Sequence, residues 1–165
     1  MPWESNQPPG AAQSPMASLP DITLSEEELV ECESCWRTLF PPDPSGGAWY
    51  MKEGFLEPLK RSVMAFALIG RAERFAILAY KQPECRARAC ETAAKACAVY
   101  PLSAYFYDFA AILERVGHLE EARALFSVFL LQPEAGPVRE IDEAMLCQRD
   151  IVAMMTHARA ALAKS

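Results

Sequence analysis

Glycine and β-branched residues are scarce in this sequence. Only 7 of its 165 residues are glycine, and its apolar residues are mostly Ala, Leu and Met rather than Val and Ile. Ala, Leu and Met favour helices, whereas Val and Ile are more typical of strands. A chain of this length is about one domain and can bury a sizeable core. The composition therefore predicts a single all-α domain.

No apolar run in the sequence is long enough to cross a membrane. The longest run, 63–69, falls far below the roughly 20 residues that a membrane-spanning helix needs. The first residues also lack the basic start and the apolar stretch of a signal peptide. We therefore expect a cytoplasmic protein without a membrane span, whose six cysteines are free thiols.

Basic residues are missing from the first part of the chain. Positions 1–35 hold seven acidic residues and no Lys or Arg, while the remaining positions hold fifteen acidic and sixteen basic residues. Proteins that bind nucleic acids need clustered Lys and Arg to neutralise phosphates. A nearly neutral body behind an acidic leader is a poor match for that task, so we expect no nucleic acid partner.

Motifs that bind phosphates, dinucleotides or catalytic metals are absent too. The sequence has no GxxxxGK, GxGxxG, HExxH or GxSxG pattern. His118 and His157 have no histidine or cysteine at metal-binding spacing and are interpreted as surface residues. We expect a protein that is not an enzyme and that needs no cofactor.

The chain divides into a leader and a helical body. Positions 1–22 are rich in Pro, Ser, Gly, Gln and Asn, and this composition predicts a disordered leader. Positions 23–165 are predicted to form one all-helical domain. Thr23 or Ser25, followed by three glutamates, is typical of a helix start, and the first helix should end near Phe40.

Prolines and glycines predict where the later helices begin and end. Positions 41–47 are expected to form a loop. Gly70 is expected to separate or bend two helices, and Gly117 should terminate a helix because glycine tolerates positive φ. A last helix is expected at about 138–163, with apolar residues along one side.

Small and aromatic residues recur at helical spacing within 104–133. They are Ala110, Gly117, Leu119, Ala122, Phe126, Leu130 and Pro133. This pattern resembles a tetratricopeptide repeat, in which small residues lie where two helices cross and glycine forms the turn. The clear repeat covers about 102–135, and a degenerate one covers about 70–101. The resemblance implies antiparallel helix pairs stacked as a short TPR-like solenoid, with 138–163 as a capping helix.

The resemblance also implies a function and a binding face. Repeats of this type bind a peptide or helix of another protein in a concave groove, so we expect a non-catalytic adaptor with a protein partner. The inner-face residues that the resemblance implies are Tyr107, Ala111, Glu114 and Arg115, together with Arg71, Arg74, Leu78 and Lys81. The layout is also similar to small bacterial secretion chaperones of this class, which keep secreted translocator proteins soluble.

Two other functions remain open from the sequence. Cys32 and Cys35 have the spacing of zinc-binding or redox pairs, although they also fit the apolar face of a helix as buried thiols. Met145, Met154 and Met155 give the last helix a face that could hold subunits together, which allows a possible homodimer or a structural oligomer.

The acidic leader suggests a further hypothesis. Its helix, or a partner peptide like it, could occupy a groove that offers Arg71, Arg74, Lys81 and Arg115. Two alternatives are a solvated acidic face that aids solubility and a helix that forms part of the core.

Overall fold

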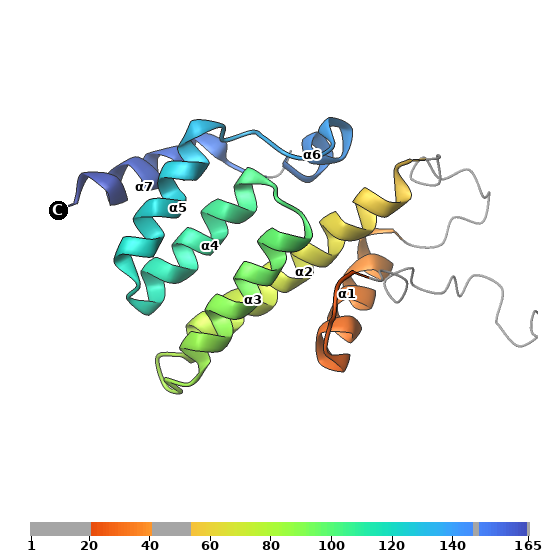
Figure 1. The fold of residues 1–165 in the computed structure, drawn as a ribbon, viewed down its shortest axis with the longest axis horizontal. Helices are drawn as coiled ribbons and strands as arrows, with labels where there is room; N and C mark the ends of the chain where they lie inside the picture. Colours follow the sequence, from red (N-terminus) through yellow and green to blue (C-terminus); the bar gives the residue numbers. More distant parts are fainter. Residues whose placement is uncertain (1–20, 41–53, 147–148, 165) are drawn as a thin grey trace, which may run out of the picture.

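The computed structural model describes residues 21–40, 54–146 and 149–164, and within them every regular element is a helix (Figure 1). The predicted all-α fold is therefore confirmed. The elements are α1 (Glu26–Leu39), α2 (Leu56–Leu78), α3 (Cys85–Val99), α4 (Ser103–Val116), α5 (Leu119–Leu131), α6 (Arg139–Leu146) and α7 (Ile151–Ala163). None of these helices is long and apolar enough to span a membrane.

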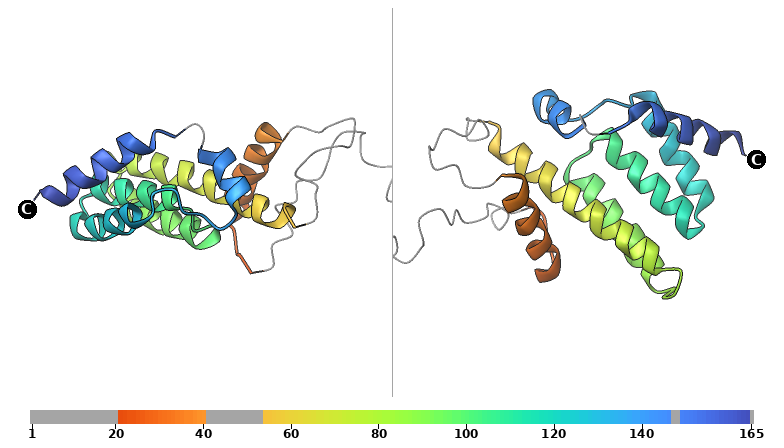
Figure 2. Two further views of the ribbon diagram at one scale, coloured as in Figure 1. Left: turned by 90° about the horizontal axis from the view of Figure 1, so that it is seen from above. Right: turned by 180° about the vertical axis from the view of Figure 1, so that it is seen from behind.

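From α1 to α5, each helix packs against the next one in the chain (Figure 1). Helix α2 packs along α3, and α4 packs along α5, each pair joined by a short turn. Helix α4 also contacts α2 and α3, which stacks the second pair onto the first. Helices α1 and α7 lie at opposite ends of the molecule (Figure 2), α1 against α2 and α7 against α5. This arrangement is compatible with a helical repeat.

Small side chains allow the close approach of α2 and α3. Ala89, Ala93 and Ala96 of α3 are fully buried, as are Ala65 and Ala72 of α2. Alanine has almost no side chain to separate two helix backbones, so the two helices can pack at short range. The small residues of α3 are therefore part of the core.

The ends of three helices follow from local chemistry. Ser25 caps α1: its hydroxyl accepts a hydrogen bond from the Glu28 amide, and the Glu28 carboxylate accepts one from the Ser25 amide. Gly117 ends α4 with a φ of 96°, as its predicted role as a terminator requires. Asp150 caps α7 by accepting a hydrogen bond from the Ala153 amide.

Two predicted helix boundaries are wrong. Helix α2 is 23 residues long and runs through Gly70 without separating into two helices, because buried Leu68, Ile69 and Ala72 anchor it on both sides of the glycine. The predicted last helix is instead two helices, α6 and α7. The Asp150 side chain accepts a hydrogen bond from the Ala153 amide in the first turn of α7. Such a capping bond favours a new helix start over a continuous helix.

The predicted leader lies almost entirely outside the described residues, which begin at Asp21. Its last two positions contact the body: Ile22 packs against the core, and the Asp21 carboxylate pairs with Arg61 at 2.6 Å. The predicted loop at 41–47 also lies outside the described residues, as does Cys147.

Candidate functional site

The structure separates the implied binding residues into three groups. Arg71 and Arg74 of α2 lie beneath α1. Leu78, Lys81 and Arg115 lie where α2 and α4 end. Tyr107, Ala111 and Glu114 share one face of α4, and two of them contact α7. Helices α1 and α7 therefore contact two of the three groups.

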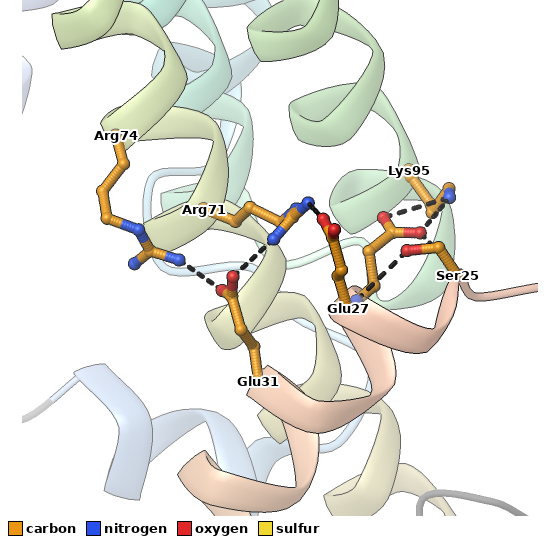
Figure 3. Close-up of polar contacts among 7 residues, drawn as sticks. Ser25, Glu27, Glu31, Arg71, Arg74 and Lys95 are labelled. Carbon is orange, nitrogen blue, oxygen red and sulfur yellow. Dashed lines mark hydrogen bonds and ion pairs between the residues drawn. The ribbon is translucent and has the colours of Figure 1, made fainter.

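The first group forms ion pairs with the acidic helix α1 (Figure 3). The Arg71 guanidinium lies 2.8 Å from the Glu27 carboxylate and 2.5 Å from that of Glu31, and Arg74 also pairs with Glu31. Lys95 of α3 pairs with Glu28 at 2.8 Å. The acidic face of α1 is therefore turned towards the basic residues of α2 and α3 and is not simply solvated.

Apolar burial also fixes α1 to the body. Cys32 is fully buried, and Trp36 is only 6% exposed. The hypothesis that the leader helix covers the basic face is right for Arg71 and Arg74 only. Lys81 and Arg115 form no ion pair within the described ranges. Helix α1 thus contributes buried side chains to the core, and its glutamates also neutralise Arg71 and Arg74.

Arg115 of the second group lines a hollow of about 370 Å³, which we name the open-end hollow. It is lined by Ala76, Ile77, Ala79, Tyr80, Arg86, Arg115 and Val116. Ile77 is 57% exposed and Tyr80 is 91% exposed, although both are large apolar residues. Arg86 and Arg115 form no ion pair in the part of the chain that the structure describes. The hollow therefore offers unpaired positive charge beside apolar surface.

The third group is engaged inside the molecule. The Tyr107 hydroxyl lies 2.6 Å from Nδ1 of His157 on α7, and Nε2 of the same ring lies 2.7 Å from Glu114. The Tyr107 ring also packs against Phe126 and Phe129 of α5. His157 is therefore a link between α4 and α7 rather than a lone surface histidine.

One buried ion pair had no signal in the sequence. Asp108 of α4, only 6% exposed, accepts two hydrogen bonds from Arg149, at 2.6 and 3.0 Å. Burial raises the pKa of Asp108, and the Arg149 guanidinium offsets part of that rise. The two residues are 41 positions apart, so no local spacing could have paired them.

The cysteine pair is poorly suited to thiolate chemistry. Burial raises the pKa of the Cys32 thiol to about 12, and burial also raises that of Cys35. A thiol must lose its proton to bind zinc or to act as a nucleophile. The buried-thiol interpretation thus fits Cys32, whereas Cys35 is only half-buried. Within the described residues, no three His, Cys, Asp or Glu side chains are grouped so that they could hold a metal ion.

Comparison with known proteins adds no relative: no family model, curated protein or solved structure matches the chain.

Proposed function

We propose that this protein is a non-catalytic, cytoplasmic interaction module whose TPR-like helix pairs hold a peptide segment of another protein. The open-end hollow carries the proposal, because Arg115, one of the implied binding residues, lines it together with exposed apolar side chains. Exposed Ile77 and Tyr80 stand there beside Arg86 and Arg115, which have no ion-pair partner among the described residues.

The chemistry of the hollow favours an acidic segment with a large apolar side chain. A guanidinium recognises a carboxylate through two parallel hydrogen bonds, which gives direction as well as attraction. Exposed apolar surface supplies affinity when a partner removes it from water. A volume of about 370 Å³ suits a short stretch of peptide better than a whole domain surface.

Selection from a displayed library of random short peptides, with the full chain as target, tests the proposal. We expect the selected peptides to combine Asp or Glu with a large apolar residue. A double substitution, Arg86→Glu with Arg115→Glu, should weaken their binding by roughly ten- to hundredfold, the range for hydrogen bonds to charged groups. Fluorescence polarisation of a labelled peptide measures the affinity.

The matched control is Arg159→Glu, which reverses an exposed arginine on α7 away from the hollow. This variant should bind the selected peptides as the original chain does. Peptides without acidic residues, or equal affinity for the double variant, would contradict the proposal.

A further inference from the structure

Neither a positive φ nor a close contact requires glycine at position 70. It lies inside α2, and its φ is not in the left-handed region. A Cβ atom at this position would meet only Nη1 of Arg74, at 3.6 Å, which is an ordinary contact. Because glycine weakens a helix interior relative to alanine, helix stability would favour a larger residue here. The missing side chain therefore invites a functional explanation.

The missing side chain leaves part of a hollow open. We name this hollow of about 260 Å³ the inner cleft. Phe66, Gly70 and Glu73 line it from α2 at spacings of four and three, which place them on one helix face. Cys35 of α1 and Asp108 of α4 also line the cleft. The cleft thus lies where α1, α2 and α4 meet.

The charges around the inner cleft leave one carboxylate without a partner. Its lining holds three acidic and two basic residues. Both arginines are already neutralised, Arg74 by Glu31 and Arg149 by Asp108. Glu73 forms no hydrogen bond or close ion pair with the described residues. An added cation would therefore find Glu73 free to pair with it.

The surroundings of Glu73 also favour the binding of a cation. The residue as a whole is exposed, but neighbouring helices displace water from its carboxyl, which raises its pKa, and Asp108 adds a smaller rise. Arg149 and Arg74 lower that pKa without pairing with Glu73. A carboxylate that is partly dehydrated and near another one gains more from a cation than one in bulk water.

Part of the lining of the cleft is apolar. Phe66 is 45% exposed although it is aromatic, and Ala67 and Ile69 lie beside it. Lys and Arg combine an apolar stem with a cationic head, so the stem can cover an aromatic ring while the head reaches a carboxylate. A volume of about 260 Å³ accommodates one such side chain.

We propose that the inner cleft receives an arginine or lysine side chain of a partner protein, with the Glu73 carboxylate as its counter-ion and Gly70 as the opening for its stem. The site is separate from the open-end hollow in position and opposite in charge preference. It stands whether or not that hollow binds acidic peptides.

Nuclear magnetic resonance titration of the full chain tests this proposal with defined probes. The probes are the N-acetyl methylamides of arginine, lysine and norleucine, the last being an uncharged analogue with a similar stem. We expect the arginine and lysine probes to shift the amide signals of Gly70 and Glu73 with saturation, and the norleucine probe to shift them far less.

Two variants remove the two proposed features. Glu73→Gln keeps the shape of the side chain but removes its charge, and it should weaken binding of the arginine probe by a factor on the order of ten. Gly70→Met fills the opening and should abolish saturable shifts, while Gly70→Ala should keep most of the binding. Circular dichroism shows whether each variant is folded.

The outcomes separate this site from the open-end hollow. The Arg86→Glu and Arg115→Glu double variant should bind the arginine probe as the original chain does, and Glu73→Gln should bind the selected acidic peptides normally. Equal shifts with the norleucine probe would overturn the proposal. Unchanged affinity of the folded Glu73→Gln variant for the arginine probe would also overturn it. If free polyamines alone gave saturable shifts, the ligand of the cleft would be a small cation and not a side chain of a partner protein.

Discussion

Two glycines show at the residue scale how backbone conformation decides the effect of a substitution. Gly117 ends α4 with a φ of 96°, a conformation that strains any residue with a Cβ atom. Its surroundings are open, since no atom lies within 4 Å of a Cβ built there. Gly70 has the reverse properties, a relaxed helical backbone with one ordinary contact. The same change to alanine should therefore have different effects at the two positions.

Gly117→Ala should lower the free energy of unfolding by about 1 to 2 kcal/mol, the usual cost of a left-handed conformation with a Cβ atom. Gly70→Ala should leave it unchanged or raise it by up to about 1 kcal/mol, because alanine is the better helix former. Urea unfolding followed by circular dichroism measures both. A Gly70→Ala variant less stable than Gly117→Ala would contradict the assigned backbone conformations.

Helix α1 is the element whose attachment depends most on charge. Four ion pairs join Glu27, Glu28 and Glu31 to residues of α2 and α3, and buried Cys32 and Trp36 supply the apolar contact. The Arg71 side chain is only 12% exposed, so its two pairs are better shielded from solvent than most surface pairs. Loss of charge on α1 should loosen this helix before the rest of the molecule.

Reversing two of these charges tests the attachment of α1. Glu27→Lys with Glu31→Lys removes three ion pairs, and each partly exposed pair is worth about 0 to 1 kcal/mol. Hydrogen exchange of the α1 amides should become faster, while that of α3 stays unchanged. High salt should act in the same direction on the original chain.

Glu26→Lys is the matched control, because Glu26 lies in the same turn and forms no ion pair with the described residues. It should leave hydrogen exchange of α1 nearly unchanged. If the α1 amides exchange at the same rate in the double variant and in the control variant, the apolar contacts alone hold the helix.

At the scale of the whole molecule, the methionine face of the last two helices is directed inwards. Met154 is only 5% exposed, and Met145 and Met155 pack against the core. The surface that could have joined two subunits is therefore largely used within one chain.

We expect a monomer in solution for this reason. Static light scattering over a range of protein concentrations should give the mass of one chain throughout. A mass that rises with concentration would instead support the homodimer that the sequence left open, and would show that another surface forms it.

The helices were predictable from the sequence, whereas the contacts between distant segments were not. Apolar spacing, a hydroxyl cap at Thr23 or Ser25, and Gly117 act within a few residues, and each correctly predicts a local feature, with Ser25 as the cap that forms. Lys95 and Glu28 are 67 positions apart, and their pairing depends on how whole helices stack. The implied inner face was divided for the same reason: α1 and α7 cover parts of it, and no local pattern indicates where a later helix docks.

The ion pairs of α1 have a consequence for heating. The cost of removing water from charged groups falls as temperature rises, so charged contacts are retained on warming, whereas concentrated salt screens them. Arg71 connects this attachment to the interior, because its guanidinium lies 5.0 Å from the centre of the Phe75 ring, and Arg88 of α3 lies 4.5 Å from the same centre. Warming at low salt should therefore melt α1 together with the α2 and α3 pair, whereas salt at moderate temperature should loosen α1 alone, because buried Cys32 and Trp36 still hold it.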